Sequence, residues 1–337
     1  MATVPSNKVP PLESKKSYLI QSFKERINRA RDLPKINHVI GSLIAEEELT
    51  ILFGRSGVGK TALAVQIGIC VAKGRRLFSF LDNEAGPLKV LYYDAEMQDR
   101  QLLNRYDIDI NLLPDNFDFM TPNWEGSYTS VIDQLNEVIE DAYKFIIIDN
   151  LHTLGERLEE SGNSRDLMME LKKIVVSKKV TVLVIAHTPN IPETCKMESS
   201  LMQGSEVLKV FLDQQIAIGN SILGEDTKYI KVLKSRNRRN DYHSSHVITT
   251  KLIKDNGYLK HDFQNFDNEA LHYNEQEQKN KDIEEAVLNV QKQNPEFSTR
   301  KIAESCKDAG VEVGKDKVNT ILKNNGIELQ KAGRKKN

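Results

Sequence analysis

Closely spaced cysteines are missing from this sequence. Cys70, Cys195 and Cys306 are its only three cysteines among 337 residues, and no C-x-x-C pair occurs. Structural zinc sites use thiolates a few residues apart, so the spacing predicts no zinc site. Isolated cysteines of this kind are typical of reduced thiols in a cytosolic protein.

Long apolar runs are missing as well. No run approaches the roughly 20 apolar residues that a membrane-spanning helix needs, so we expect no membrane span. Residues 1–16 are polar, contain prolines and lack the apolar stretch of a secretory signal. The sequence therefore predicts a cytoplasmic protein with no membrane partner.

A large excess of one charge is also absent. The 47 Lys and Arg residues against 48 Asp and Glu residues give a net charge of −1. The protein as a whole is no polycation, so nucleic-acid binding would depend on local basic patches. Two such patches occur: a cluster of Lys231, Lys234, Arg236, Arg238 and Arg239, and a tail containing Lys331, Arg334, Lys335 and Lys336.

Composition and periodicity divide the chain into four segments. Residues 1–35 are expected to form an N-terminal arm with one helix over 17–31. Residues 36–264 alternate apolar, strand-like runs with helical stretches. Residues 265–281 are rich in Asn, Gln, Glu and Lys, which predicts a linker, and the pattern of residues 282–337 predicts a small helical domain.

The segment 36–264 predicts an α/β fold with a mostly parallel, twisted sheet flanked by helices. Four of its runs are almost continuously apolar, as in strands buried on both faces. Helices over 61–73 and 127–141 are expected as crossovers between parallel strands. The four runs span residues 49–54, 89–94, 144–149 and 180–186, and two weaker runs, 215–218 and 229–234, are expected to extend the sheet.

The C-terminal segment predicts three short helices, over residues 282–293, 298–309 and 315–325. Ser298 is suited to cap the second helix. Gly310 and Gly326 follow the second and third helices, at positions where a left-handed residue is favoured.

A glycine-rich motif follows the first apolar run. It matches G-x-x-x-x-G-K-[ST] in full and lies between a predicted strand and a predicted helix. Glycines let successive N–H groups turn toward phosphate oxygens, and the helix N-terminus adds its positive end. Lys60 would reach the β- and γ-phosphates of ATP, and the Thr61 hydroxyl would bind Mg²⁺. The predicted nucleotide-binding residues are Gly54, Arg55, Ser56, Gly57, Val58, Gly59, Lys60, Thr61 and Ala62.

Two further apolar runs end in carboxylates. Asp149 ends the run that begins at Lys144, and it is expected to hold Mg²⁺ together with Thr61. Glu96 follows the run 89–94, which we expect to lie next to the strand before the glycine-rich loop. Glu96 would then orient the attacking water as a general base. Asp94 is the alternative base, and the other interpretation of Glu96 is an acidic residue in the first turn of a helix.

Together these residues resemble the RecA-type ATPases, and within them the branch with plasmid RepA-type and DnaB-type hexameric helicases. The resemblance rests on the glycine-rich loop, Asp94–Met97, the Asp149 strand and Ile185–Thr188. It covers about residues 36–251 and implies a RecA-like core that uses ATP and Mg²⁺.

The resemblance also implies roles for individual residues. Glu96 corresponds to the catalytic glutamate and His187 to the residue that senses the γ-phosphate. The other interpretation of His187 is a histidine that completes a hydrogen bond at a strand end. Lys234 and Arg236 match the Lys-x-Arg pattern of an arginine finger, with Arg238 as the second candidate, although a solvated basic hairpin would have the same composition. A finger that reaches a neighbouring subunit implies a homo-oligomer, which we expect to be a hexamer.

The resemblance places two loops along a central channel that holds single-stranded DNA. The matching segments are residues 152–166 and 189–205, and both are long and polar, as mobile functional loops are. The first is acidic, with Glu156, Glu159 and Glu160, which disfavours a grip on phosphates.

The C-terminal helices resemble a helix-turn-helix or winged-helix domain that binds duplex DNA. Lys315, Lys317 and Lys323 would lie on its recognition helix. A three-helix docking module is the alternative.

The sequence thus predicts an ATP-hydrolysing, DNA-associated motor of the RepA/DnaB-like helicase class. The resemblance places it in the replication or mobilisation of a plasmid-like or mobile element. The alternatives are a non-unwinding, ATP-dependent DNA-binding regulator or loader, and a RecA/RadA-like strand-exchange recombinase.

Overall fold

The computed structural model describes residues 20–121, 131–139, 142–150, 161–189, 191–202 and 205–327. Its N-terminal unit contains α1 (Phe23–Arg31), which lies within the helix expected over residues 17–31. Ser22 and Glu25 form a capping box, in which the Ser22 hydroxyl accepts a hydrogen bond from the Glu25 N–H at 3.2 Å. This reciprocal bonding fixes where the helix begins.

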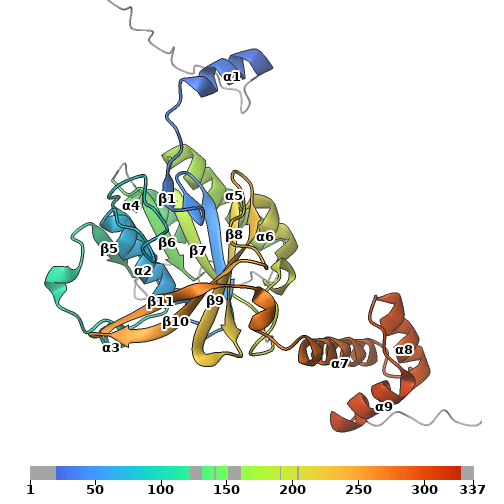
Figure 1. The fold of residues 1–337 in the computed structure, drawn as a ribbon. Helices are drawn as coiled ribbons and strands as arrows, with labels where there is room; N and C mark the ends of the chain where they lie inside the picture. Colours follow the sequence, from blue (N-terminus) through green and yellow to red (C-terminus); the bar gives the residue numbers. More distant parts are fainter. Residues whose placement is uncertain are drawn as a thin grey trace, which may run out of the picture. The chain divides into compact units, whose positions relative to one another are not determined.

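A nine-stranded sheet forms the centre of the second unit (Figure 1). Its order is β11-β10-β9-β8-β3-β7-β6-β4-β5, and the strands from β8 to β5 run parallel. The expected mostly parallel sheet is therefore confirmed. The strands are β3 (Leu49–Gly54), β4 (Val90–Asp94), β5 (Phe117–Met120), β6 (Phe145–Asp149), β7 (Thr181–His187), β8 (Gln214–Ser221), β9 (Gly224–Ser235), β10 (Val247–Asp255) and β11 (Tyr258–Asp267).

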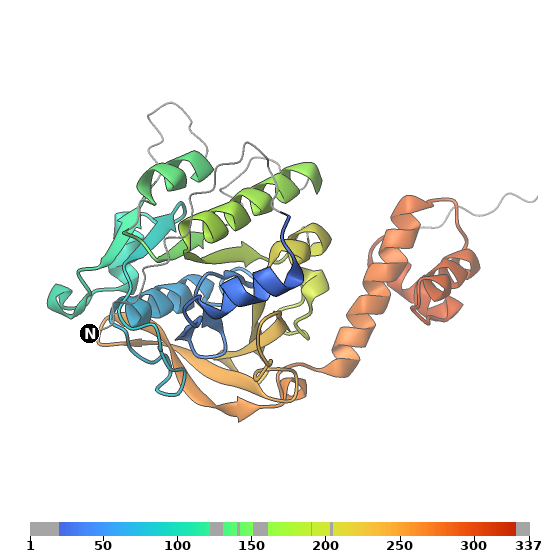
Figure 2. The ribbon, with the colours of Figure 1, turned by 90° about the horizontal axis from the view of Figure 1, so that it is seen from above.

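Helices cover both faces of the sheet, because its central strands are apolar on both sides (Figure 2). Alternate residues of β3 face opposite ways: Ile51 packs with one group of helices, and Leu52 packs with α2 (Lys60–Ala72). A short hairpin of β1 (His38–Ile40) and β2 (Ile44–Ala45) lies on the α2 side. The group opposite α2 consists of α4 (Val131–Val138), α5 (Ser161–Lys178) and α6 (Ser205–Phe211).

The strand order corrects one expectation. β4 does not lie next to β3, because β7 and β6 stand between them. Strand neighbours depend on long-range pairing, which the local apolar pattern does not encode.

The segment expected to be a linker contains regular structure. Residues 265–267 belong to β11, and η4 (Glu269–Leu271) follows. Glu269 is buried in an ion pair with Lys231 of β9, at 2.6 Å. The polar composition of 265–281 therefore includes a buried charge pair, which a composition rule cannot separate from solvated polar residues.

The C-terminal helical region expected from the sequence is present as α7 (Glu275–Gln293), α8 (Thr299–Asp308) and α9 (Lys315–Asn324). These helices enclose a small core of their own that includes Ile302 and Val318. Gly310 and Gly326 have φ angles of 84° and 71°, as predicted for residues that end helices.

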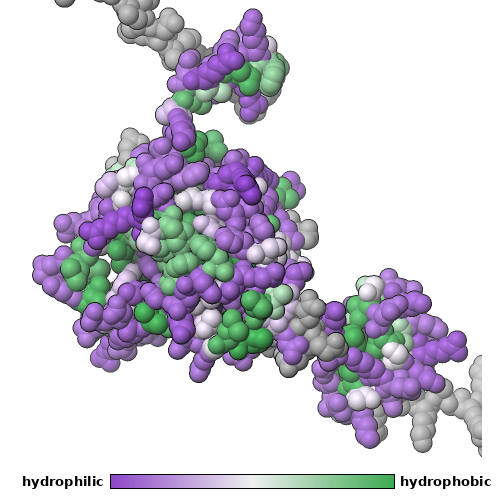
Figure 3. Space-filling model, viewed as in Figure 1, coloured by the Kyte–Doolittle hydropathy of each residue, from purple (hydrophilic) through white to green (hydrophobic). Residues whose placement is uncertain are grey.

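The surface seen in Figure 3 is mainly hydrophilic, with separate apolar patches. Among the described helices, none combines the length and the apolar character that crossing a bilayer requires.

Candidate nucleotide site

The glycine-rich motif forms the turn between β3 and α2, as predicted. Gly57 and Gly59 have φ angles of 80° and 94°, a region that side chains with a Cβ rarely adopt. A Cβ on Gly54 would come within 2.3 Å of the Ile218 carbonyl oxygen. The loop therefore needs glycine at positions 57 and 59 for the backbone conformation and at position 54 for space.

The Lys60 side chain lies inside this turn. Its Nζ donates hydrogen bonds to the carbonyl oxygens of Gly54 and Arg55, at 3.0 and 2.9 Å. The same Nζ lies 3.1 Å from Nδ1 of His187. Burial lowers the pKa of Lys60 to about 8, although the charges of Asp149 and Glu96 act in the opposite direction. The ammonium is thus held at the centre of the loop.

Asp149 and Thr61 meet beside the loop. Oδ2 of Asp149 accepts hydrogen bonds from the Thr61 hydroxyl at 2.8 Å and from the Tyr92 hydroxyl at 2.7 Å. Oδ1 of Asp149 is buried and has no hydrogen-bond partner among the described residues. Burial raises the pKa of Asp149, whereas the two hydroxyl hydrogen bonds lower it.

These two side chains fit a magnesium ion. Carboxylate and hydroxyl oxygens are the ligands that Mg²⁺ takes in phosphate sites. The free, buried Oδ1 of Asp149 is an acceptor that such an ion, or water bound to it, would satisfy. The predicted pairing of Thr61 with Asp149 at one place is what the fold produces.

Glu96 lies on the turn after β4 and approaches the same site. Its Oε1 is 3.5 Å from Nε2 of His187 and accepts a hydrogen bond from the Asn150 side chain. The hydrogen bond with His187 lowers the pKa of Glu96, and Lys60 acts in the same direction. The carboxylate is therefore ionised at neutral pH, the state a general base needs.

Asp94, the alternative base, has another task. Its Oδ1 accepts hydrogen bonds from the backbone N–H groups of Glu96 and Met97, at 3.1 and 2.9 Å. The acidic residue in the first turn of α3 (Asp99–Arg105) is Asp99, so Glu96 lies before the helix and is not its first-turn acid. Asp94 shapes the turn that presents Glu96.

The sheet register explains why residues far apart in sequence meet. Gly54 pairs with His187, and Asp94 pairs with Asp149. The carboxyl ends of β3, β7, β6 and β4 therefore share one edge, where ligands bind in open α/β sheets. Sequence reasoning did not include Tyr92 and Asn150, since a tyrosine inside a strand and an asparagine after it give no separate signal.

The basic residues Lys234 and Arg236 lie at the opposite end of the sheet, where β3 begins. Ser235 of β9 pairs with Gln214, which pairs with Thr50 at the start of β3. The Arg236 guanidinium donates to the carbonyl oxygen of Val210, and Lys234 donates to that of Lys209. The fold therefore does not bring Lys234 and Arg236 to the glycine-rich loop of their own chain.

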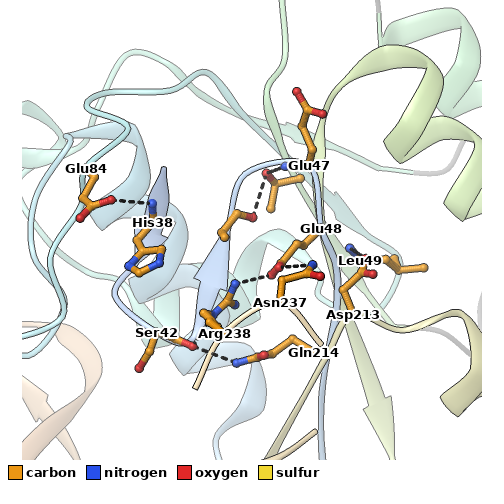
Figure 4. A network of polar contacts seen from close by, with 12 residues as sticks. His38, Ser42, Glu47, Glu48, Leu49, Glu84, Asp213, Gln214, Asn237 and Arg238 are labelled. Atoms are coloured by element: carbon orange, nitrogen blue, oxygen red, sulfur yellow. Dashed lines mark hydrogen bonds and ion pairs between the residues drawn. The ribbon is translucent and has the colours of Figure 1, made fainter. Parts of the chain in front are cut away.

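Arg238 belongs to a buried network at that edge (Figure 4). Its Nη1 lies 2.7 Å from Oε2 of Glu48, and its Nε donates to the Ser42 carbonyl oxygen at 2.8 Å. Asn237 donates to the other Glu48 oxygen at 3.0 Å. Arg238 is thus held almost buried within its own chain, whereas Arg236 is exposed, so Arg236 is the stronger prediction for an arginine finger.

The two predicted DNA loops are only partly described. Residues 152–160, Asn190, Gln203 and Gly204 lie outside the described residues, as do the basic residues Lys331, Arg334, Lys335 and Lys336. Residues 161–166 of the first loop begin α5.

In the described part of the second loop, residues 191–202, the apolar side chains pack against the core while several polar side chains are exposed. Cys195, Met197 and Met202 are buried there. The Met197 N–H donates to Glu269 at 3.0 Å. The segment is therefore anchored by its apolar side chains, while Glu193, Lys196, Glu198 and Ser200 are exposed.

Comparisons with known proteins place these residues among related sequences. A family described as AAA domain (AAA_25) matches residues 19–191, which include the glycine-rich loop, Glu96, Asp149 and His187. The early transcription factor 70 kDa subunit of Myxoma virus (strain Lausanne) is 21% identical over 258 residues. That of Rabbit fibroma virus (strain Kasza) is 21% identical over 256 residues. Each alignment covers 70% of this chain, and the chain spans only 38% of either relative.

Two solved structures are similar at low identity. The KaiC-like protein PH0186 from Pyrococcus horikoshii OT3 has 16% identity and a TM-score of 0.48, covering 68% of this chain and 99% of its own. The RadB recombinase has 15% identity and a TM-score of 0.47, covering 66% of this chain and 93% of its own.

Proposed function

Because the chain belongs to the AAA domain family, we propose that it binds ATP with Mg²⁺ and hydrolyses the γ-phosphate bond. The observation that carries this proposal is the meeting of four groups at one sheet edge: Lys60, the Thr61–Asp149 pair, Glu96 and His187. A positive charge, a metal site and an ionised carboxylate at one place are what phosphoryl transfer requires.

Each residue has a distinct task in this proposal. The N–H groups of the glycine-rich loop and Lys60 hold the phosphates, and Thr61 with Asp149 holds the metal. Bound Mg²⁺ would neutralise phosphate charge. Glu96 accepts a proton from water that attacks the phosphorus. His187, in contact with both Lys60 and Glu96, connects the phosphate position to the base.

We further propose that this hydrolysis drives a DNA-associated motor of the RepA/DnaB-like helicase class, in replication or mobilisation of a plasmid-like element. The resemblance of the site residues supports this class. The curated relatives are transcription factor subunits, which fits an ATPase acting on or beside nucleic acid.

The C-terminal helices supply a surface for duplex DNA. Val318, Ile321 and Leu322 face the bundle core, and Lys315, Asn319 and Lys323 lie on the exposed side. Lys315, Asn319 and Lys323 recur at every fourth position and so share one helix face. A lysine–asparagine–lysine face can contact phosphates and base edges in a major groove. Lys317, by contrast, donates to Asn280 at 2.7 Å and is held against α7.

This surface makes a prediction that separates the lysines of α9. The double variant Lys315→Ala/Lys323→Ala should bind duplex DNA several-fold more weakly. The slope of its affinity against salt concentration should fall by the amount that corresponds to about two lost phosphate contacts. Lys317→Ala is the matched control and should retain affinity and salt dependence. Fluorescence anisotropy with labelled duplex at several salt concentrations measures both, and equal losses in all variants would contradict the assignment.

One observation favours a non-unwinding regulator or loader as the second candidate. The segment 191–202 is anchored to the core through Cys195, Met197 and Met202, which restricts the movement of this part of the predicted DNA loop. A protein of this kind would hydrolyse ATP while assembled on DNA without separating its strands.

Purified protein should hydrolyse ATP only when Mg²⁺ is present, because Asp149 and Thr61 bind phosphate only through the metal. Phosphate release is measured with and without single-stranded DNA, and strand separation is measured on a forked duplex. Stimulation by DNA together with unwinding supports the motor, and stimulation without unwinding supports the regulator. Failure to bind labelled ATP with Mg²⁺ would refute both.

A further inference from the structure

The β10–β11 hairpin crosses the helix that follows the glycine-rich loop. The side chain of Gln66 in α2 bonds both backbone groups of His261 in β11. It accepts from the N–H at 2.9 Å and donates to the carbonyl at 3.0 Å. Near the hairpin tip, Lys254 donates to the Asn104 carbonyl in α3 at 2.8 Å, and Tyr258 bridges to Tyr106. The β10–β11 hairpin therefore contacts α2, which follows the glycine-rich loop, and α3, which follows Glu96.

His261 connects this hairpin to the loop itself. Its ring Nε2 lies 3.0 Å from the Gly59 carbonyl oxygen, and its Nδ1 lies 3.0 Å from the Thr250 hydroxyl. A carbonyl oxygen only accepts, so Nε2 carries the ring proton, and Nδ1 accepts from Thr250. Only 1% of His261 is exposed. Burial lowers its pKa to about 4, although the hydrogen bond to Gly59 raises it, so the ring is neutral at physiological pH.

We propose that His261 is a positioning residue for nucleotide binding, holding the first peptide of α2 in the orientation that aims its N–H at phosphate. The inference rests on the proposed ATPase function. In a planar trans peptide, the carbonyl of Gly59 and the N–H of Lys60 point in opposite directions. An imidazole that holds the carbonyl on the hairpin side thereby turns the Lys60 N–H toward the loop.

The surroundings of Gly59 support this role. Its carbonyl also accepts from Leu63 N–H at 3.0 Å, so His261 gives it a second donor beyond the ordinary helical bond. A Cβ on Gly59 would lie 2.6 Å from Nε2 of His261, so the ring packs directly against the backbone. The φ angle of 94° at Gly59 is one that a free chain visits only with glycine. The β10–β11 hairpin thus holds the glycine-rich loop at Gly59, where the loop's own backbone is most flexible.

The test compares substitutions that keep or remove the donor at Nε2. His261→Leu should weaken Mg·ADP affinity about tenfold, the effect of one lost hydrogen bond. His261→Gln places an amide N–H near the Nε2 position and should restore affinity to within about threefold of wild type. His246→Leu is the matched control, since His246 is exposed and stacks on Phe266. Affinity is measured by calorimetry, and folding by thermal melting.

Each outcome decides something definite. Wild-type affinity in His261→Leu overturns the inference, as does an equal loss in His261→Gln, which would show that the ring only fills space. Should His261→Leu fail to fold, Thr250→Val removes the hydroxyl that fixes the ring proton and should weaken affinity by a smaller factor. Unchanged affinity in that variant then overturns the inference. No Mg·ADP binding by the wild type would refute the proposed function instead.

Discussion

Replacing Glu96 with glutamine is expected to slow ATP turnover at least about 100-fold while nucleotide affinity stays near that of the wild type. Glutamine keeps the size of the side chain and its hydrogen bond with Asn150, but it cannot accept a proton from water. The glycine-rich loop and the Thr61–Asp149 pair, which we propose hold the nucleotide, are untouched. Steady-state phosphate release and binding of a fluorescent ATP analogue measure the two properties separately.

The neighbouring Asp99 provides the control for this experiment. Asp99 is also acidic and lies three residues further along, but it belongs to the first turn of α3. Asp99→Asn should turn over ATP at close to the wild-type rate. If the Glu96→Gln protein hydrolysed ATP at the wild-type rate, Glu96 would be excluded as the base. Asp94 would then be the remaining candidate.

Replacing Arg236 with alanine is expected to reduce turnover by about 10³-fold, the magnitude of a lost arginine finger. Arg236 lies at the sheet edge opposite its own glycine-rich loop, so it can act only on the site of another subunit. Mixing Arg236→Ala with Glu96→Gln should then restore part of the activity. In the mixed oligomer, some interfaces combine an intact Glu96 with an intact Arg236 from the neighbour.

Arg239 serves as the comparison in the same stretch. Its side chain is 90% exposed and lies 3.8 Å from Asp241, so Arg239→Ala should leave turnover almost unchanged. Mass measurement in solution tests whether the two variants form mixed oligomers of the size expected for the wild type. If such oligomers form without regaining activity, the shared site is refuted, and Arg236 has a role within its own subunit.

Local patterns predicted the strands and the helix around the candidate site with few errors. The strand predicted over residues 49–54 is β3, and α2 begins within one residue of the predicted start. The predictions of β3 and α2 were correct because the apolar run, the glycines and the helix signals all indicate the same structure. The strand ending at Asp149 was found for the same reason, since its run has no polar interruption.

The errors fall where polar residues are buried by distant partners. Residues 265–281 looked like a linker, because the sequence does not show that Glu269 pairs with Lys231. The β10–β11 hairpin was missed, although Asn256 and Gly257 have the positive φ angles of a tight turn between its strands. Its strands mix Lys, Asp, Gln and Asn with apolar residues, so their pattern gave no clear strand signal.

By itself, the sequence identified the residues of the proposed chemistry: a glycine-rich loop for phosphate, a carboxylate for the metal, a candidate base and a polar residue at a strand end. Only the tertiary structure decided which of these meet, because strand order and register bring together residues up to 133 positions apart, as Gly54 and His187 are. The tertiary structure alone also tied Arg238 to Glu48 and set His261 against Gly59. The physical reason is that pairing across a sheet and burial of polar partners are long-range contacts, and no local pattern of residues records them.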